Sequence, residues 1–528
     1  MWKYIQSSES AFAMVLNTKK SISVIAACLA DSRGIGFQGQ LPWEHIREDL
    51  SFFQNKTTEL GCSGGGKINA VIMGRRTWEG LPPSGIRGAQ AHLPGRLNIV
   101  VSRTLADACG GMNASPIHFA PTLTSALRYC DEQAAVEKVW VIGGSGLYAE
   151  AMALPECQDL WITEISSVSE VDSPPTQADT FFPTIPEQYS EREADRIQIV
   201  SENGFWNLRF MHYQNAFNPW SPERDYLSLM QYILLHGERL KDRTGVGILQ
   251  VFAGGPEDPD LKALLPLSFP VRVVNEAEAA GDVQKFKYQI PAVTTKRLFL
   301  RGAIVELIWF LNGFTNNKWL QERKVHIWDG NSTREFLDSR GLTDYPEGEL
   351  GPVYGKQWVN WDGINQIAEI IRLCREEPWS RRMLLSGWNV GDLSKMALPP
   401  CHDSYSFMVT DQDKPIKTLN LLVRIRSNDM FLGNPFNVAS ASVLLILMSR
   451  CAGMRTGRVA FAITNAHLYL NQLEEVKKQV QRCPYHYPIL ELKKDVREYE
   501  DMKGLEYKDF KLHNYKHWKP LAKVKMAA

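Results

Sequence analysis

The chain of 528 residues has no excess charge of either sign, because 59 Lys and Arg residues balance 59 Asp and Glu residues. A neutral balance gives no electrostatic argument for binding nucleic acid or a membrane surface. The nine cysteines are scattered and contain no C-x-x-C pair, so we expect no metal site and a reducing compartment. The run AFAMVL near the N-terminus is too short for a secretion signal, and we identify no stretch that reaches a membrane span. These absences predict a cytoplasmic protein.

Hydrophobic residues make up 44% of the chain and charged residues 22%, which are values of globular proteins. The length predicts two or three domains. From residue 21 onward, β-rich runs such as NAVIMG and KVWVIGG alternate with helical segments, until a stretch with two prolines ends the pattern. We predict an α/β first domain and an α+β second domain. The predicted boundaries are a leader at 1–20, a first domain at 21–213, a linker at 214–222 and a second domain at 223–528.

Two glycine-rich segments come close to nucleotide-binding motifs. GIGFQG (34–39) fits G-x-G-x-x-G, but Pro42 and Trp43 delay the helix that has to begin at the glycines. GCSGGGK (61–67) ends before Ile68, where a P-loop needs Ser or Thr to reach magnesium. We therefore interpret both as loops.

Four longer motifs of the first domain are more specific. They occur in the order GIGFQGQLPWEHIREDLSFF, VIMGRRTWEGLP, LPGRLNIVVSR and VWVIGGSGLY. Together they resemble dihydrofolate reductase across residues 21–213. Asp49 lies one turn into the predicted helix, between apolar Leu50 and Phe53. A buried carboxylate can bind the flat, amidine-like edge of a pterin through two parallel hydrogen bonds, whereas a solvated helix-start acid is the alternative.

The resemblance implies roles for three residues on the substrate side of the reductase. Asp49 binds the pterin and supports its protonation at N5, and Phe53 packs on the ligand. Arg96 binds the carboxylate of the glutamate tail, a task that suits the planar guanidinium. An ordinary turn arginine after Pro94 and Gly95 is the alternative for Arg96.

The resemblance also implies NADPH as the cofactor that delivers hydride. Arg103 directly follows a predicted strand and is placed like a family residue that binds the 2′-phosphate. The residues from Gly74 to Thr77 are expected to start a helix that faces phosphate. Glycines near position 143 allow close approach of the backbone to the pyrophosphate. The predicted cofactor residues are Ala27, Gly36, Gly74, Arg75, Arg76, Thr77, Ser102, Arg103, Gly143, Gly144, Ser145 and Gly146.

The second domain contains KDRTGVG, VELIWFLNG, HIWD, LGPVYGKQW, SRRMLLSGWN, MALPPCH, RSNDMFLGNPFNVAS and NAHLYLNQ in this order. These motifs resemble thymidylate synthase over residues 223–528, and the whole chain resembles the fused enzyme of protists and plants. Two prolines precede Cys401, and a small buried residue is the alternative to a catalytic thiol. With the resemblance, Cys401 is the nucleophile that adds to C6 of dUMP, and neighbouring arginines favour its thiolate.

Other roles in the second domain combine residue type with the resemblance. Glu306 is the one polar residue of AIVELIWFL, so we expect a buried carboxyl group with a raised pKa that shuttles protons, with a structural acid as the alternative. Tyr354 assists removal of the C5 proton, and the amide of Asn437 suits uracil O4 and N3–H. The remaining implied substrate residues are Arg243, Arg426 and Ser427 on the phosphate, Arg381 and Arg382 from the partner subunit on the same phosphate, Asp429 beside the uracil ring, and His467 and Tyr469 on the ribose hydroxyl.

The chain departs from the family pattern at several positions around this site. Ile425 stands where Gln is usual, Ala441 where Tyr is usual, Asn465 where Asp is usual and Gln472 where His is usual. We expect the covalent machinery to be intact and the surrounding hydrogen bonding to be thinned, with modestly weaker dUMP binding.

We therefore predict a bifunctional enzyme without a metal site. It makes dTMP from dUMP and 5,10-methylenetetrahydrofolate, and it reduces the dihydrofolate product to tetrahydrofolate with NADPH. A homodimer forms through the second domain, and neither membrane nor nucleic acid is an expected partner. The alternatives are an active reductase fused to a weakened or inactive synthase that serves as a dimer scaffold, and an RNA- or folate-binding regulatory protein without turnover.

Overall fold

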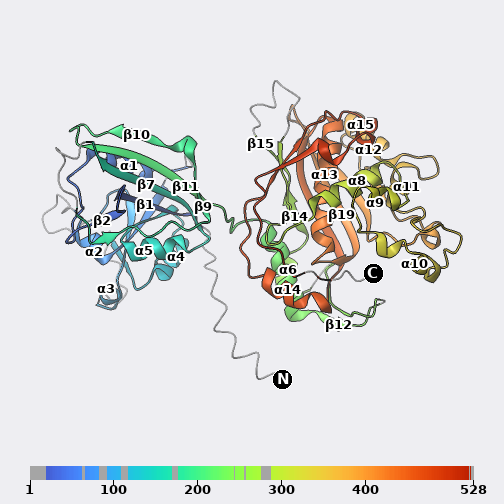
Figure 1. The fold of residues 1–528 in the computed structure, drawn as a ribbon, viewed down its shortest axis with the longest axis horizontal. Helices are drawn as coiled ribbons and strands as arrows, with labels where there is room; N and C mark the ends of the chain where they lie inside the picture. The colour runs from blue at the N-terminus through green and yellow to red at the C-terminus, as the bar shows by residue number, and fades with distance from the viewer. Residues whose placement is uncertain are drawn as a thin grey trace. The chain divides into compact units, whose positions relative to one another are not determined.

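The structure is a computed structural model that describes residues 20–61, 66–81, 92–108, 117–168, 177–242, 244–254, 257–274, 287–522 and 524. The chain divides into two compact units, Met1–Pro219 and Trp220–Ala528 (Figure 1). Almost all of the predicted leader lies outside the described residues. The linker boundaries stay a prediction.

The first unit is built on a nine-stranded mixed sheet with the strand order β10-β11-β7-β1-β6-β3-β4-β5, and β9 pairs with β11. Neighbours from β7 to β5 along this order are parallel, whereas β11 is antiparallel to both β7 and β10. The strands are β1 (Ile22–Leu29), β3 (Ile68–Gly74), β4 (Arg96–Val101), β5 (Ile117–Ala120), β6 (Val136–Gly143), β7 (Cys157–Ser167), β9 (Tyr189–Glu191), β10 (Ile197–Val200) and β11 (Trp206–Asn215).

Helices cover both faces of this sheet, as Figure 1 shows. Apolar residues of α4 and α5 pack on one face, and those of α1, α2 and α3 pack on the other. The helices are α1 (Arg47–Thr58), α2 (Arg75–Glu79), α3 (Arg103–Ala108), α4 (Leu123–Glu132) and α5 (Ser145–Met152), and β2 (Gly34–Gly36) pairs with β8 (Thr180–Phe181). The predicted α/β class is confirmed. Because β6, β3 and β4 are adjacent and parallel, their carboxyl ends form one edge where ligand loops gather.

The second unit combines two sheets with a set of helices. A seven-stranded sheet has the order β12-β13-β20-β19-β18-β17 with β14 beside β20, and a four-stranded sheet has the order β15-β16-β21-β22. The strands are β12 (Glu238–Leu240), β13 (Ile248–Phe252), β14 (Leu267–Pro270), β15 (Arg272–Val274), β16 (Lys287–Gln289), β17 (Leu384–Ser386), β18 (His402–Thr410), β19 (Thr418–Asp429), β20 (Arg455–Tyr469), β21 (Ile489–Leu492) and β22 (Phe510–His513). The helices are α6 (Glu223–His236), α7 (Pro259–Ala263), α8 (Leu300–Leu311), α9 (Lys318–Glu322), α10 (Arg334–Ser339), α11 (Tyr354–Val359), α12 (Gln366–Glu376), α13 (Gly433–Ala452), α14 (Leu473–Gln479) and α15 (Tyr499–Lys503). This mixture confirms the predicted α+β class.

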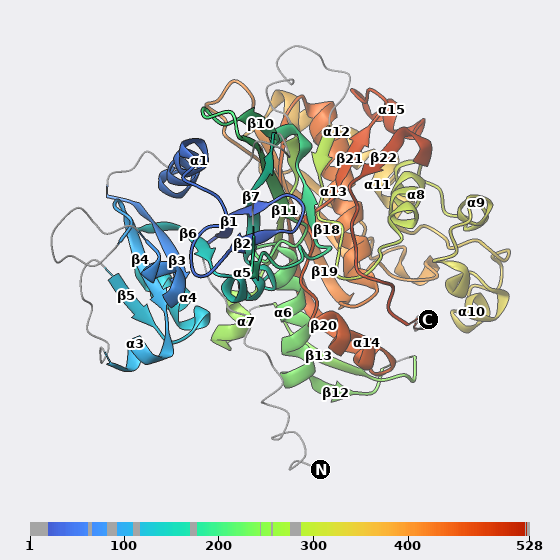
Figure 2. The ribbon, with the colours of Figure 1, turned by 60° about the vertical axis from the view of Figure 1, so that its left-hand side comes forward.

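Helix α13 is the centre of the second core and lies against the long strands β19 and β20 (Figure 2). Apolar residues lie on all sides of its middle turns because this helix is surrounded by protein, and it ends at Gly453 with a φ of 67°, a common helix stop. From the sequence we expected no stretch that could span a membrane. This expectation is wrong for α13, which is long and apolar enough to do so. However, 72% of the helix segment that meets those criteria is buried in the fold, as in a core helix.

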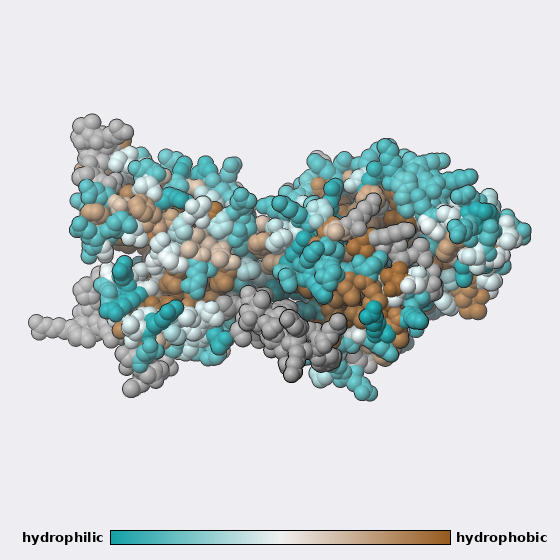
Figure 3. All heavy atoms as spheres, turned by 60° about the horizontal axis from the view of Figure 1, so that its bottom comes forward, coloured by the Kyte–Doolittle hydropathy of each residue, from teal (hydrophilic) through white to brown (hydrophobic). Residues whose placement is uncertain are grey.

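The face of the seven-stranded sheet that points away from α13 exposes apolar side chains. Leu384, Met408 and Leu422 are 51%, 63% and 41% exposed on three neighbouring strands. Figure 3 shows hydrophobic residues gathered on an exposed side of this unit. Several exposed apolar side chains on one face of a sheet are typical of a protein–protein contact.

Candidate active sites

The first predicted site lies around Asp49, in the first turn of α1. The hydroxyl of Thr163 on β7 bonds its carboxyl group, and Thr163 pairs in register with Ala27 of β1. Burial of the carboxyl group raises the pKa of Asp49 to about 6, and the Thr163 hydrogen bond offsets only part of this rise. The side chain can therefore exchange a proton near neutral pH.

Phe53 and Arg96 lie next to each other on the same side of this unit. The Arg96 guanidinium carbon is 5.9 Å from the centre of the Phe53 ring, and its Nη1 donates to Thr57 Oγ1 at 2.6 Å. Its Nε also donates to the Pro94 carbonyl at 3.1 Å. Arg96 is half-buried, and this burial lowers its pKa. The bond to Pro94 lies within the turn, whereas the bond to Thr57 joins Arg96 to α1.

Most of the predicted cofactor residues gather at the carboxyl ends of β6, β3 and β4, whereas Ala27 lies on β1 and Gly36 on β2. Gly143 has a φ of 131°, and a Cβ there would approach both Thr77 Oγ1 and the Tyr148 hydroxyl to 3.2 Å, so glycine is required. The structure thus brings the β6 glycines against the start of α2. Beside them, Ser102 and Arg103 follow β4, and the Ser102 hydroxyl lies 3.2 Å from that of Thr104. This narrow glycine cradle beside hydroxyls and an arginine fits a dinucleotide phosphate.

Two other predicted cofactor residues, Arg75 and Gly36, make contacts elsewhere. Arg75 donates to Glu79 along α2 at 2.7 Å, which commits its guanidinium to an exposed ion pair. Gly36 ends β2, where it pairs with Thr180 of β8.

Cys401 precedes β18 and is held by its backbone. Its N–H donates to the Tyr354 phenol oxygen at 2.7 Å, and its carbonyl accepts from the Arg426 backbone N–H at 2.9 Å. The Arg426 guanidinium donates to the carbonyls of Pro400 at 2.8 Å and Pro399 at 3.2 Å. The carbonyl oxygens of the two prolines therefore hold the Arg426 guanidinium at the segment that directly precedes Cys401.

Glu306 lies on α8 with its carboxyl group turned into the protein. Its Oε1 accepts from the Trp328 indole N–H at 2.7 Å, and burial raises the pKa of Glu306 to about 7. Burial also raises the pKa of Tyr354 well above its usual value, while it lowers that of His402 to about 3. His402 therefore stays neutral where it stacks on the Tyr354 ring at 4.2 Å between centroids.

The residues predicted to bind the nucleotide gather where β19 and β20 end and α13 begins. Ser427 pairs with Asn465, and Asp429 pairs with His467. His467 contacts the Tyr469 ring edge-on at 5.3 Å, and Asn437 lies on the second turn of α13. One end of the sheet thus carries these groups together.

Hydrogen bonds around His467 contradict the expectation of a thinned network at Asn465. The Asn465 Oδ1 lies 2.8 Å from His467 Nδ1, and its Nδ2 donates to Gln250 Oε1 at 2.5 Å. An amide can replace a carboxylate as the acceptor here because a second amide on β13 fixes its orientation. Sequence reasoning missed Gln250.

The expectation is also wrong at Gln472, which is 1% exposed. Its Nε2 donates to Asp429 Oδ2 at 3.0 Å, and its Oε1 accepts from the Tyr469 backbone N–H at 3.1 Å. The other Asp429 oxygen accepts from two backbone N–H groups before α13, at 2.9 and 3.0 Å. Ile425 and Ala441, by contrast, are buried in the apolar core and make no polar contact through their side chains.

The structure describes only some of the arginines that are predicted to bind the phosphate. Arg243 lies outside the described residues. Arg381 and Arg382 are exposed directly before β17, at the edge of the open sheet face, and Arg382 pairs with Glu377 at 3.2 Å.

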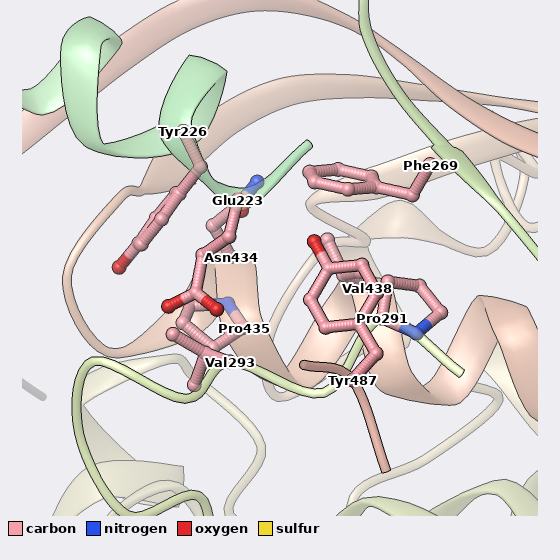
Figure 4. A pocket seen from close by; sticks show the side chains of 9 residues that line it. All are labelled: Glu223, Tyr226, Phe269, Pro291, Val293, Asn434, Pro435, Val438 and Tyr487. Carbon is pink, nitrogen blue, oxygen red and sulfur yellow. The ribbon is translucent and has the colours of Figure 1, made fainter. Parts of the chain in front are cut away.

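Two cavities of the second unit do not involve the predicted site residues. One of about 10 Å³, lined by residues such as Glu223 and Asn434, is no larger than a water molecule (Figure 4). The other, of about 480 Å³, lies at the C-terminal end of α13. Within the described ranges, no three His, Cys, Asp or Glu side chains are grouped in a way that could hold a metal ion.

Comparisons with known proteins cover both units. The dihydrofolate reductase family model matches residues 21–215, and the thymidylate synthase family model matches residues 224–528. Bifunctional dihydrofolate reductase-thymidylate synthases are similar across the whole chain. That of Leishmania major is 34% identical over 96% of this chain and 95% of its own length, and that of Zea mays is 32% identical over 94% and 95%. The enzyme of Paramecium tetraurelia is 32% identical over 95% of this chain and 97% of its own length. The resemblance inferred from the motifs is confirmed: the chain belongs to the bifunctional dihydrofolate reductase–thymidylate synthase family, with an NADPH-dependent oxidoreductase and a methyltransferase that uses 5,10-methylenetetrahydrofolate in one chain.

Proposed function

We propose that the two sites of this chain perform consecutive reactions through the residues named above. The synthase site makes dTMP and dihydrofolate from dUMP and 5,10-methylenetetrahydrofolate, and the reductase site returns dihydrofolate to tetrahydrofolate. The observation that supports this most is the setting of Cys401: its backbone N–H donates to the Tyr354 hydroxyl, and the carbonyl of the preceding Pro400 accepts from the Arg426 guanidinium. The contacts around His467 and Asp429 give no support to a degraded synthase site.

In the synthase site, the Cys401 thiolate adds to C6 of dUMP, which makes C5 nucleophilic toward the one-carbon unit. After the one-carbon unit is bonded to C5 and the C5 proton is lost, a hydride from tetrahydrofolate reduces the methylene to the methyl group, so the folate leaves as dihydrofolate. The S–C6 bond breaks when dTMP leaves, so the thiolate is regenerated. Glu306 exchanges protons with the base because its pKa of about 7 allows both states at neutral pH. The buried Tyr354 hydroxyl directs removal of the C5 proton. Asn437 reads O4 and N3–H of the uracil.

The other synthase residues bind the nucleotide. Arg426 and Ser427 bind the phosphate together with Arg243, while His467 and Tyr469 bind the ribose hydroxyl. Asp429 sits beside the base, where Gln472 and two backbone N–H groups hold its carboxylate in one orientation.

In the reductase site, Asp49 binds the edge of the pterin ring and supports protonation at N5. Its pKa of about 6 lets it hold a proton in a useful fraction of molecules near neutral pH. Phe53 packs on the ring, and Arg96 binds the glutamate-tail carboxylate. NADPH, which supplies hydride to C6, is held by the glycines from Gly143 and the start of α2, with Arg103 on its 2′-phosphate.

We also propose a homodimer through the open face of the seven-stranded sheet. A second subunit on this face removes its exposed apolar residues from water. Arg381 and Arg382 lie at the edge of the same face, where they can reach the phosphate site of a neighbouring subunit. A cytoplasmic location stays part of the proposal.

Subunit mixing tests the shared site. Inactive Cys401→Ala subunits and inactive Arg381→Ala subunits are combined, because a mixed dimer carries one site with both residues intact. Recovery of dTMP synthesis supports the proposal. No recovery after verified subunit exchange contradicts it.

Covalent capture of 5-fluoro-dUMP tests the proposed chemistry. With methylenetetrahydrofolate, the adduct should appear by mass spectrometry on the peptide that contains Cys401, and Cys401→Ala should form none. Absence of an adduct at millimolar nucleotide contradicts the synthase assignment.

A further inference from the structure

Three asparagines form a chain of side-chain hydrogen bonds that ends at the base-reading residue. Asn434 Nδ2 donates to Asn428 Oδ1 at 2.7 Å, and Asn428 Nδ2 donates to Asn437 Oδ1 at 3.0 Å. Asn428 lies near the end of β19, whereas Asn434 and Asn437 belong to the first turns of α13. The chain therefore ties the orientation of the Asn437 amide to two residues behind it.

The two supporting residues are buried away from water, because Asn428 is 2% and Asn434 is 1% exposed. If Asn437 alone reversed its amide, its NH₂ would face the NH₂ of Asn428, and donor would oppose donor. If Asn428 reversed as well, its NH₂ would face that of Asn434. Reversal thus requires all three amides to turn together or leaves buried polar groups unpaired, which is costly.

The orientation of this amide has a direct chemical consequence. Uracil presents a donor at N3–H and an acceptor at O4, whereas cytosine presents an acceptor at N3 and a donor at N4. An amide that fits one base has to be reversed to fit the other. With Asn437 Oδ1 fixed by Asn428, one orientation of the amide is available, and under the proposed function it is the one that suits uracil.

We propose that Asn428, held by Asn434, determines the specificity of this site for a uracil nucleotide over a cytosine nucleotide by fixing the amide orientation of Asn437. The proposal rests on the role of Asn437 given under the proposed function. Asn428 and Asn434 themselves do not touch the base and act as positioning residues.

Asn428→Asp is the most informative variant because it has nearly the same shape and its carboxylate only accepts. It still accepts from Asn434, but it requires a donor from Asn437, which turns its NH₂ inward and its oxygen toward position 4 of the base. We expect the ratio of kcat/KM for dUMP to that for dCMP to fall at least about tenfold. Asn434→Leu releases Asn428 and should lower the same ratio by about threefold to tenfold, as expected for one hydrogen bond.

The control is Asn420→Asp, at the other end of β19, where the side chain bonds Thr410 and the Arg458 backbone instead. It should leave the ratio unchanged. Thermal unfolding of each variant checks the fold, and calorimetric Kd values for dUMP and dCMP give the same ratio without turnover. If folded Asn428→Asp and Asn434→Leu proteins keep the wild-type ratio, the proposal is wrong.

Asn437→Ala separates this result from a failure of the proposed function. If that variant also keeps the wild-type ratio, Asn437 is not the base reader and the assignment of its role fails. If Asn437→Ala loses selectivity while both supporting variants keep it, only the inference about Asn428 and Asn434 is overturned.

Discussion

A comparison of two buried glutamates in the second unit shows that burial alone does not make a carboxyl group reactive. Glu223 at the start of α6 is 2% exposed, and its two oxygens accept from the backbone N–H groups and hydroxyls of Thr294 and Thr295 at 2.7–3.0 Å. Glu306 on α8 is less enclosed, and among the described residues its carboxyl group accepts one hydrogen bond, from Trp328. Burial raises the pKa of both.

The difference lies in what each carboxyl group can still do. The lone pairs of Glu223 are occupied by fixed donors, so this side chain fastens α6 to the segment that holds Thr294. Glu306 keeps an oxygen for a substrate or water and can change its protonation state. Asp49 in the first unit follows the pattern of Glu306, with a raised pKa and, in the described part of the chain, one hydroxyl partner, Thr163.

The largest expected effect comes from exchanging each glutamate for its amide. Glu306→Gln should lower the kcat of dTMP synthesis by about 10²–10⁴, the range of general acid–base catalysis, with little change in thermal stability. Glu223→Gln should instead destabilise by about 1–3 kcal/mol, because the new NH₂ opposes the N–H donors of Thr294 and Thr295. Steady-state kinetics and thermal unfolding measure both. The comparison fails if Glu223→Gln loses turnover in the folded protein while Glu306→Gln loses only stability.

Asp49→Asn sharpens the comparison in the other unit. We expect reductase turnover near neutral pH to fall by about 10² or more, because the variant can neither ionise nor supply a proton. The folded-state pKa of about 6 is above the unfolded value of about 3.9. The buried charge therefore costs stability above pH 6, and this cost disappears as pH falls toward 4.

The same variant should consequently gain about 1–2 kcal/mol of stability at pH 8 and none at pH 4. Urea unfolding at the two pH values checks this. A loss of turnover below threefold would remove Asp49 from the site.

Arg103→Ala tests an exposed binding group, which should change affinity without changing stability. The variant should raise the KM for NADPH by about tenfold or more, since charge-assisted hydrogen bonds contribute about 1.5–3 kcal/mol. The KM for NADH, which lacks the 2′-phosphate, should change less than threefold. Equal changes for the two cofactors would place the 2′-phosphate contact elsewhere.

The smallest expected effect concerns His212, a satisfied and therefore structural group like Glu223. Burial would lower its pKa, but hydrogen bonds at 2.8 Å to both Asp159 and Asp195 outweigh burial and raise it. Its contribution to stability is complete below the unfolded pKa of about 6.5 and is lost as pH rises through the folded value. His212→Gln should cost more stability at pH 5.5 than at pH 9, with reductase kcat unchanged. An equal loss at both pH values would exclude the charged imidazole as the cause.

The chemical groups of both sites could be predicted from the sequence because they follow from residue type and motif. Glu306 stood out as the polar residue of an apolar helix, and Cys401 as a thiol fixed by two prolines. Their hydrogen-bond partners could not be predicted. Trp328, His402, Gln250 and Asn428 reach the sites from other elements through tertiary packing, which residue spacing does not encode.

The departures from the family pattern illustrate the same limit. Asn465 and Gln472 looked like losses, because their effect depends on Gln250 and Asp429 across the sheet. The predicted loss of hydrogen bonding was wrong for this reason. Strand register and amide orientation decide such contacts, and neither can be read from one sequence.

A coupled assay tests the central claim, that this chain performs both reactions, most directly. The wild-type protein is mixed with NADPH, methylenetetrahydrofolate and dUMP, and NADPH oxidation is followed with dTMP formation. We predict that NADPH is consumed only after dUMP is added and that one NADPH disappears for each dTMP formed. If added dihydrofolate oxidises NADPH while dUMP never does, the synthase unit is inactive and the bifunctional account is wrong.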